Sequence, residues 1–427
     1  MNGARLHDDR RGLSIRLFIA GVVAGLIQWM WIPPLPPGLG FETFAEAKNL
    51  AEHGAFANPF YVANTGYTAV NPPLYPLVLA LLMKLPATPA FVTVAAVAGN
   101  IVASAIVAAW LPRIAVVLFG DSIPGVVAAV IWLVSVQLMP AWDSSYTVAG
   151  LVLFCVYSAS SIGRAGGAVR FGALAGGAVG FLALLNTSSL LVSLPWVAYL
   201  IVKREVSFQR AARYGSVLLV VALLIVSAWV LRNYYRLGAP VLRTNLGMTL
   251  YASNNDCAEP SLVETEGRGC YQSHHPNMSM SEAELVRTLG EVAYDRRRTA
   301  DAWSWAMENP GPFRRLTAAR VRGFWFPPPD HPAYTAYVIW FATLLSVPGM
   351  ILMLRNREPA LVFMMTVLLV YPPMYYVVVT DVRYRYPVLW LTFLFAGYFI
   401  RKAMGAWPKT TLRAALDRGR VRPRSEA

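Results

Sequence analysis

Residues 90–111, AFVTVAAVAGNIVASAIVAAWL, contain no charged side chain and decide the class of fold. Residues 17–32 and 215–231 are also uncharged, and similar runs recur along most of the chain. Windows of about 20 apolar residues match the hydrocarbon thickness of a bilayer. Of the 427 residues, 56% are hydrophobic and 14% are charged, against about 25% charged in an average soluble domain. The sequence therefore predicts a polytopic membrane protein and excludes a disordered chain, a disulfide scaffold and an average soluble enzyme.

About ten apolar segments have the length of a membrane span, and one further run is too short. A helix over residues 74–85 would measure about 18 Å, against a hydrocarbon core of about 30 Å, so we expect it to lie along the membrane surface. The short loops on one side are then basic, which places them and both chain ends in the cytoplasm by the positive-inside rule. The predicted spans are residues 17–32, 90–111, 123–139, 146–162, 171–185, 190–202, 215–231, 334–354, 360–379 and 386–400.

The predicted fold is an all-α, polytopic bundle with two polar regions on the outer side. Residues 13–231 form an N-terminal transmembrane module, which includes a first outer loop over residues 38–89. Residues 232–333 form a small, mainly helical periplasmic loop domain, residues 334–402 the C-terminal transmembrane helices, and residues 403–427 a basic cytoplasmic tail. The formal net charge of +14 fits inner loops that face anionic lipid better than it fits binding to nucleic acid.

The large outer loop contains two cysteines and two adjacent histidines. Cys257 and Cys270 are disulfide candidates, with two free thiols as the alternative. His274 and His275 follow one another, and adjacent histidines rarely face a single ion, so we expect no metal here. Two soluble helices are expected in the same loop, over residues 282–305 and 312–324.

Carboxylates at the outer ends of spans are the candidate general bases. In a helix, Glu42, Glu46, Asn49 and His53 fall within one narrow sector, and Gly54 is a suitable C-terminal stop. Glu42 or Glu46 could remove a proton from a substrate, or could merely stabilise the positive N-terminus of the helix. Asp143 lies at another outer mouth, where it could orient an acceptor or assist Glu42, or could cap the next helix.

Arginines at the outer boundary are the candidate phosphate ligands. Arg383 and Arg385 lie at the outer boundary, where the positive-inside rule disfavours arginine, so a specific role is expected for them. The planar guanidinium suits phosphate because it makes two charge-assisted hydrogen bonds. Alternatively, the two side chains reach lipid headgroups or pair with Asp381. Arg232 and Arg243 are weaker candidates of the same kind.

Several short motifs occur in a characteristic order along the chain. They are Glu42 early in the first outer loop, Pro72-Pro73-Leu74-Tyr75-Pro76 before a short helix, Arg232-Asn233-Tyr234, Asn254-Asn255, and Arg383-Tyr384-Arg385-Tyr386-Pro387. Together with the topology, this order resembles the C-type (GT-C) membrane glycosyltransferases. The resemblance is to the bacterial branch related to protein O-mannosyltransferases and aminoarabinose transferases, and it covers most of residues 13–400.

The resemblance implies an inverting glycosyltransferase at the periplasmic face of a bacterial inner membrane. Its donor would be a polyprenyl-phosphate-linked sugar, and its acceptor a lipid, a glycan or a protein. Glu42 maps onto the family's base, with Glu46 as the fallback, and no cofactor is needed; a divalent cation is not favoured. The donor phosphate would lie near Arg383, Arg385, Arg232 and Arg243, in a pocket shared with Tyr75, Asn71, Tyr384, Tyr386 and Asn254.

Two other classes of protein stay open at this point. A transporter or flippase of lipid-linked sugars would carry polar residues through the membrane midplane. A scaffold without catalytic activity would use the outer loops only to bind partners. The predicted spans are nearly free of charge and the polar residues gather at one membrane face, which favours the enzyme.

Overall fold

The computed structural model describes residues 2–31, 42–85, 88–135, 142–162, 167–204, 206–329 and 333–406. Within these ranges the regular elements are helices, and β-pairing is limited to two isolated bridges, Ala57 with Tyr67 and Ser261 with Thr380. The chain is an all-α polytopic membrane protein. Residues 136–139 of one predicted span and residues 407–427 of the predicted tail lie outside the described residues.

The apolar segments predicted as spans fall on helices of one bundle, except that the span predicted over residues 360–379 is divided into Ala360–Val370 and Pro373–Tyr376. Among the described residues, five helices are long and apolar enough to cross a membrane. These are α1 (Asn2–Trp31), α4 (Pro89–Phe119), α9 (Phe208–Leu237), α16 (Ala333–Arg355) and α19 (Val382–Ala406). Shorter helices complete the bundle: α5 (Ile123–Ser135), α6 (Ser144–Ser161), α7 (Ala168–Leu185), α8 (Leu190–Lys203) and α17 (Ala360–Val370). How many of them cross the bilayer stays a prediction.

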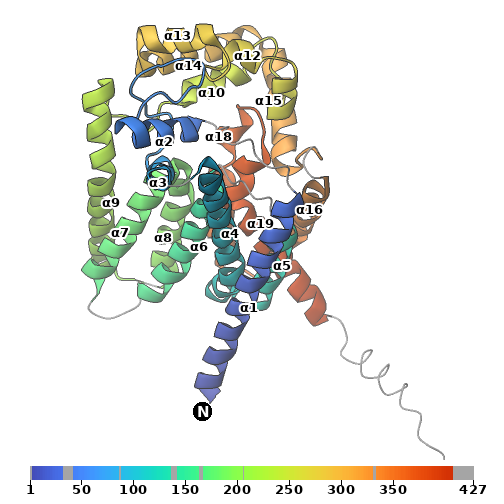
Figure 1. Ribbon diagram of the computed structural model, residues 1–427. Helices are drawn as coiled ribbons and strands as arrows, with labels where there is room; N and C mark the ends of the chain where they lie inside the picture. The colour runs from blue at the N-terminus through green and yellow to red at the C-terminus, as the bar shows by residue number, and fades with distance from the viewer. Residues whose placement is uncertain are drawn as a thin grey trace, which may run out of the picture.

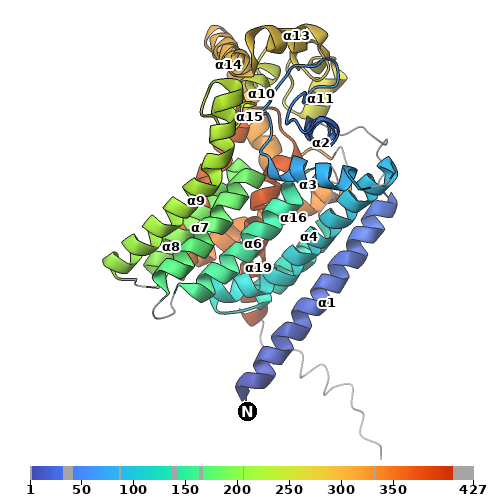
Figure 2. The same ribbon diagram turned by 60° about the vertical axis from the view of Figure 1, so that its left-hand side comes forward.

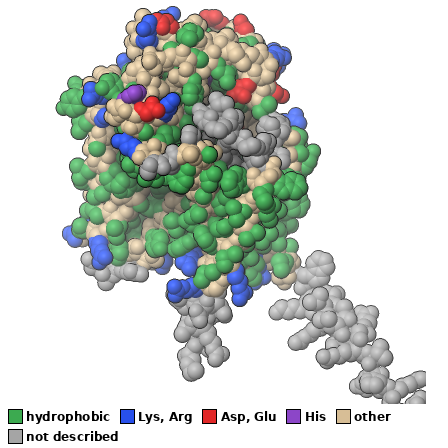
Figure 3. All heavy atoms as spheres, viewed as in Figure 1, with side chains coloured by type: hydrophobic (Ala, Val, Ile, Leu, Met, Phe, Trp, Pro, Cys, Tyr) green, Lys and Arg blue, Asp and Glu red, His purple; other side chains and the backbone are tan. Residues whose placement is uncertain are grey.

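The surface of the bundle is apolar, as a bilayer requires. Large side chains such as Leu224 and Phe341 are exposed on it, and Figure 3 shows hydrophobic side chains over this face with Lys and Arg along its lower edge. Some polar groups inside the bundle are paired within it. The indole nitrogen of the buried Trp132 donates to Ser104 Oγ at 3.0 Å, which avoids the cost of an unpaired N–H in an apolar interior.

Helices α7 and α9 pack closely because small residues line their contact. A Cβ added at Gly176 would lie 2.4 Å from the Leu218 carbonyl oxygen, and Gly172 and Gly180 face α9 in the same way. Their spacing is the small-xxx-small pattern of membrane helix contacts. Gly177, the next residue along, has nothing within 4 Å of its added Cβ.

A loop domain covers one end of the bundle, which we call the loop end (Figures 1 and 2). Two helices of the first outer loop, α2 (Glu42–His53) and α3 (Leu74–Met83), lie between this domain and the bundle, and Figure 2 shows α3 running across the bundle rather than along it. The domain consists of α10 (Leu246–Ser253), α11 (Leu262–Gly267), α12 (Tyr271–His274), α13 (Met280–Leu289), α14 (Glu291–Glu308) and α15 (Pro310–Trp325).

The local signals in the sequence largely locate these loop-end helices. Helix α2 ends at His53, and Gly54 follows it with φ +66°. The single helix expected over residues 282–305 is wrong, because the chain forms two helices, α13 and α14, on either side of Gly290. Gly290 adopts φ +81° and ψ 149°, a conformation that interrupts a right-handed helix and that glycine adopts at little cost.

Buried polar residues join the loop domain to the rest of the protein. Arg320 of α15 is fully buried and donates to the side-chain oxygen of Asn254 at 3.0 Å. The Glu291 carboxylate, at the start of α14, accepts from the Ala69 N–H at 2.7 Å and from the Thr244 hydroxyl. The Arg320 bond lies within the loop domain, whereas the bond from Ala69 fixes the first outer loop against that domain. The residues that could do chemistry lie at this junction.

Candidate active site

Glu42 begins α2 and faces the loop domain. Its side chain is 14% exposed, and its Oε1 lies 3.7 Å from Nε2 of His275, which follows α12. As the first residue of the helix, its carboxylate also lies at the positive end of the α2 dipole. Glu42 is therefore a carboxylate held at the junction of the first outer loop and the loop domain.

His275 is a buried imidazole whose two nitrogens have different partners. Nδ1 accepts from the Asn277 N–H at 3.2 Å, so in the neutral ring the proton is on Nε2, the atom that faces Glu42. The ring stacks on Tyr271 at 4.8 Å between centroids. Burial lowers the pKa of His275, the Glu42 carboxylate opposes this shift, and the Arg383 charge adds to it. The imidazole is therefore neutral at pH 7.

Arg383, in the first turn of α19, approaches the same histidine from the bundle. Its guanidinium carbon lies 3.9 Å from the centre of the Trp142 ring. Its Nη2 donates to the Tyr384 hydroxyl at 3.2 Å, and its Nε lies 3.7 Å from the Asp381 carboxylate. The pKa of Tyr271 is raised chiefly by burial, and the charges of Glu42 and Arg383 act on it in opposite directions, Glu42 raising it and Arg383 lowering it. We call Glu42, Trp142, Tyr271, His275 and Arg383 the junction site.

Asp143 lies beside the junction site at the start of α6. Its Oδ2 accepts from the Asn186 side-chain amide at 2.8 Å. Burial raises the pKa of Asp143, and the hydrogen bond from Asn186 and the charges of Arg243 and Arg383 oppose that shift. Although Asp143 occupies the N-cap position of α6, its side chain makes no capping hydrogen bond. The capping interpretation of Asp143 is therefore wrong, and its carboxylate lies among the polar groups of the loop end.

Glu46 is one helical turn beyond Glu42 and is fully buried. Its Oε2 accepts from Asn71 Nδ2 at 3.2 Å. The side-chain oxygen Oδ1 of Asn71 in turn accepts from Arg243 Nη2 at 3.4 Å. Within the described residues, Oε1 of Glu46 has no hydrogen-bond partner. Burial raises the pKa of Glu46 well above its ordinary value. Arg243, at the other end of this chain of hydrogen bonds, is exposed to solvent. Of the two charged residues, Arg243 is therefore the one that a substrate could reach.

Arg385 does not reach the junction site. Its side chain is 1% exposed, and it donates to the carbonyl oxygens of Trp325 at 2.6 Å and Phe324 at 3.4 Å. It also donates to the hydroxyls of Thr343 at 2.9 Å and Thr392 at 3.1 Å. Arg385 thus binds the C-terminal end of α15, where a cation is favoured. This geometry corrects the expectation that Arg385 binds a phosphate.

Four other expected site residues serve packing. Arg232 donates to the carbonyl oxygens of Thr68 and Phe56, which attaches the first outer loop to α9. Tyr75 is buried with its ring 5.5 Å from Tyr146, and the Tyr386 hydroxyl lies 3.5 Å from Ser145 Oγ inside the bundle. Asn254 donates to the Val377 carbonyl at 2.9 Å. Arg232 as a phosphate ligand, and Tyr75, Tyr386 and Asn254 as pocket residues, stay predictions. Asn71 and Tyr384 lie at the loop end.

Three residues of the junction site were missing from the expected site. Trp142 lies in a connecting segment and Tyr271 begins the four-residue helix α12, and neither position carries a distinctive sequence pattern. His275 was considered only with His274 as a metal ligand. The contact between α12 and α2 depends on the folding of the whole loop domain, and no local sequence signal reveals it.

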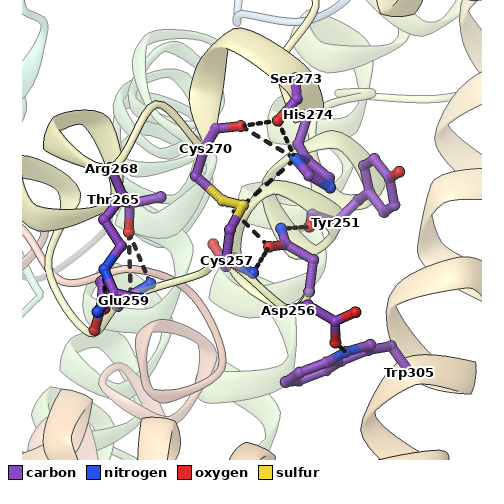
Figure 4. The surroundings of a disulfide bond; sticks show 12 residues. Tyr251, Asp256, Cys257, Glu259, Thr265, Arg268, Cys270, Ser273, His274 and Trp305 are labelled. Carbon is purple, nitrogen blue, oxygen red and sulfur yellow. Dashed lines mark hydrogen bonds and ion pairs between the residues drawn. A yellow bond between two sulfur atoms is a disulfide. The ribbon is translucent and has the colours of Figure 1, made fainter.

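A disulfide joins Cys257 and Cys270 in the loop domain, with the Cα atoms 5.8 Å apart (Figure 4). Among the described residues, the one group of three possible metal ligands is formed by these two cysteines and His274. His274 Nδ1 lies 3.8 Å from Cys257 Sγ. Neither sulfur offers a thiolate while the disulfide is intact, so this group does not fit a metal ion.

No protein-family model matches the sequence, and no curated protein matches it significantly. Solved structures of the archaeal oligosaccharyltransferase AglB from Archaeoglobus fulgidus are similar in fold. In complex with an inhibitory peptide and a dolichol-phosphate, AglB matches 97% of this chain with a TM-score of 0.51 and 10% identity. The apo form matches 98% with a TM-score of 0.54 and 11% identity. The form with Zn and sulfate matches 93% with a TM-score of 0.52 and 12% identity.

The similarity extends over nearly all of this chain but only part of its neighbours. The chain spans about half the length of the oligosaccharyltransferase chains, 52%, 52% and 50% of the three. At 10 to 12% identity the likeness is one of backbone arrangement. The chain therefore shares its fold with a membrane-bound oligosaccharyltransferase.

Proposed function

We propose that this chain is an inverting membrane glycosyltransferase of the GT-C type, with a polyprenyl-phosphate-linked sugar as its donor. The fold likeness supports this class, because the similar archaeal protein is an oligosaccharyltransferase that binds a dolichol-phosphate and an inhibitory peptide. The branch related to protein O-mannosyltransferases and aminoarabinose transferases is the one that the sequence motifs favour. The acceptor is a lipid, a glycan or a protein.

The approach of Glu42 to His275, together with the electrostatic effect of Arg383 on His275 and Tyr271, supports this proposal. Transfer with inversion needs a base beside the acceptor and a cation beside the departing phosphate. Glu42 removes the proton from the acceptor hydroxyl, whose oxygen forms a bond to the anomeric carbon. The bond from that carbon to the phosphate oxygen breaks, and its electron pair leaves with the polyprenyl phosphate. Arg383 faces the negative charge that develops there.

Neighbouring polar groups provide the rest of the site. Arg243 is exposed at the loop end and close enough to Asp143 to influence its ionisation, so the two residues would position the sugar or the acceptor. The proposed reaction has no step through a metal ion. Among the described residues, no set of three metal-ligand side chains gathers at Glu42.

We assign the loop end to the periplasmic side of a bacterial inner membrane. The opposite end of the bundle is basic, with Lys203 and Arg204 at the end of α8 and Arg401 and Lys402 in the last turns of α19, as expected for a cytoplasmic face. The lipid tails of the donor would enter from the side between helices, while the sugar and phosphate lie at the junction site.

A flippase for lipid-linked sugars is the main rival. Such a protein moves a polar headgroup through the bilayer and needs polar or charged side chains along the path. Among the described bundle helices, Arg385 is the fully buried charged residue, and its guanidinium is engaged by α15, α16 and α19. The bundle interior therefore favours an enzyme that works at one face.

Mass spectrometry of the envelope glycans from a deletion strain tests the proposal. We expect one sugar to be missing, and to return with the wild-type protein and with the control Glu52→Gln, an exposed acid on the same helix. Glu42→Gln and Arg383→Gln should not restore it. Restoration by Glu42→Gln would remove Glu42 as the base. Movement of a radiolabelled donor across liposomes without bond cleavage would support the flippase instead.

A further inference from the structure

One contact between the loop domain and the first outer loop is not used by the mechanism above. His275 lies at the end of α12, and it presents a ring nitrogen to the carboxylate of Glu42 on α2. We propose that His275 is a positioning residue for Glu42: its Nε2–H holds Oε1, so that Oε2 points at the acceptor hydroxyl. This inference rests on the proposed role of Glu42 as the base.

The imidazole is held from three sides, so it can act as a fixed donor. The Asn277 N–H occupies Nδ1 and sets the tautomer, and the stack on Tyr271, with 17° between the planes, sets the plane of the ring. The Phe60 ring meets it edge-on, with 6.4 Å between centroids. Such a donor costs little further entropy when it orients a flexible glutamate.

The distance suits a contact that tightens on substrate binding. At 3.7 Å, Nε2 and Oε1 are beyond a hydrogen bond but within a small side-chain rotation of one. Catalytic hydrogen bonds are often long in structures without substrate and shorten in the complex. The two side chains are 9% and 14% exposed, so little water competes for the contact.

The charges around the ring keep it neutral, which suits the role. Glu42 on α2 and Glu282 on α13 favour the protonated ring, whereas burial and Arg383 on α19 disfavour it. Tyr271 on α12 stacks on the ring and carries no charge at neutral pH, because burial raises its pKa. A neutral donor orients the carboxylate without removing its basicity, whereas an imidazolium would stabilise the ionised carboxylate and weaken it as a base.

The arrangement makes catalysis depend on docking of the loop domain. Glu42 is on a helix that precedes most of the bundle, and His275 is on a domain inserted between α9 and α16. The base is therefore oriented only when α12 lies against α2. This pair of side chains therefore couples sugar transfer to the position of the loop domain.

Three variants test the inference in purified, membrane-reconstituted enzyme with the donor and acceptor identified from the glycan analysis. His275→Phe keeps a ring to stack on Tyr271 but has no N–H. His275→Gln keeps an N–H near the position of Nε2. His274→Phe is the matched control, because the ring of His274 faces Tyr251 and the disulfide instead of Glu42.

We expect His275→Phe to lower kcat about 10- to 100-fold, the cost of a misplaced catalytic group, with the donor KM within about twofold of wild type. The acidic limb of its kcat profile should move to higher pH, because kcat reports the substrate complex, in which the carboxylate has lost its hydrogen-bond donor. His275→Gln should recover most of kcat and the wild-type profile, and His274→Phe should match wild type in both.

Two results would overturn the inference. One is a His275→Phe enzyme with the kcat and pH profile of His274→Phe. The other is a loss of kcat in His275→Phe that comes with a lowered Tm and that His275→Gln does not recover. That outcome would indicate a structural role only. An active Glu42→Gln enzyme would instead overturn the proposed base itself, whatever the His275 variants show.

Discussion

The guanidinium of Arg383 lies over the face of Trp142, with its central carbon 3.9 Å from the centre of the ring. The contact joins the start of α19 to the segment that leads into α6, two parts of the chain that lie far apart in the sequence. An arginine stacked in this way keeps its charge and its planar donors in one orientation. Arg383 is therefore a preorganised cation at the loop end of the bundle.

Replacing Arg383 by lysine should weaken donor use without unfolding the protein. Lysine keeps the charge but loses both the two-pronged hydrogen bonding and the stack on Trp142. Charge-assisted hydrogen bonds contribute about 1.5–3 kcal/mol, so we expect kcat/KM for the donor to fall about 10- to 100-fold. Arg236→Lys is the control, because Arg236 also lies over an aromatic ring, that of Tyr67. Equal effects of the two substitutions on kcat/KM would contradict a role for Arg383 at the phosphate.

Replacing Arg385 by methionine should affect stability more than substrate use. The substitution removes the charged donor to the Trp325 and Phe324 carbonyls and to the Thr343 hydroxyl. A buried group left unpaired costs about 1–3 kcal/mol. We expect a lower Tm and a lower yield of folded protein, with the donor KM of the folded fraction unchanged. Thermal unfolding in detergent measures the first effect. A variant as stable as wild type would show that these bonds contribute nothing.

Glu46→Gln should stabilise the protein at neutral and alkaline pH. Burial raises the pKa of Glu46 above its ordinary value of 4.5, so the folded state binds this proton more tightly than the unfolded state does. Its contribution to stability is therefore present below pH 4.5 and is lost as the pH rises through the raised pKa. Glutamine carries no charge to bury and can still accept from Asn71. The Tm difference between variant and wild type should grow from pH 4 to pH 8, and a constant difference would contradict this account.

Gly176 and Gly177 form a matched pair on α7. An added Cβ at Gly176 meets the Leu218 carbonyl at 2.4 Å, whereas one at Gly177 meets nothing within 4 Å. Gly176→Ala should therefore destabilise the α7–α9 contact, by about 1–3 kcal/mol for an overpacked interior. Gly177→Ala should be neutral or slightly stabilising, because alanine favours helix more than glycine does. Thermal unfolding of the two variants decides, and similar Tm values would show that α7 and α9 can move apart freely.

The helices of the bundle were predictable because their cause is local. An uncharged segment of about 20 residues must satisfy its backbone internally in a bilayer, and a helix does so without any partner. The end of α2 at Gly54 and the shortness of α3 follow from equally local signals. The break at Gly290 was missed because a glycine within an amphipathic pattern can either continue a helix or end it, and packing decides between the two.

The site was only partly predictable because its geometry depends on contacts between distant segments. Glu42 and Arg383 were identified from their residue types at the outer boundary. Arg385 was grouped with Arg383, although two residues along an α-helix turn the side chain by about 200°, which places the two arginines on opposite faces. The role of His275 depends on where the loop domain docks, which no pattern in the chain encodes locally.

The position of α19 as the last helix of the described chain has a consequence for biosynthesis. Helices α2 and α12 and the segment around Trp142 leave the ribosome well before Arg383 and Arg385 do. A nascent chain that stops short of α19 contains Glu42 but lacks Arg383. It also lacks Arg385, which binds the carbonyl oxygens at the end of α15. The protein can therefore become competent only after α19 has been made, however early α2 and α12 are in place.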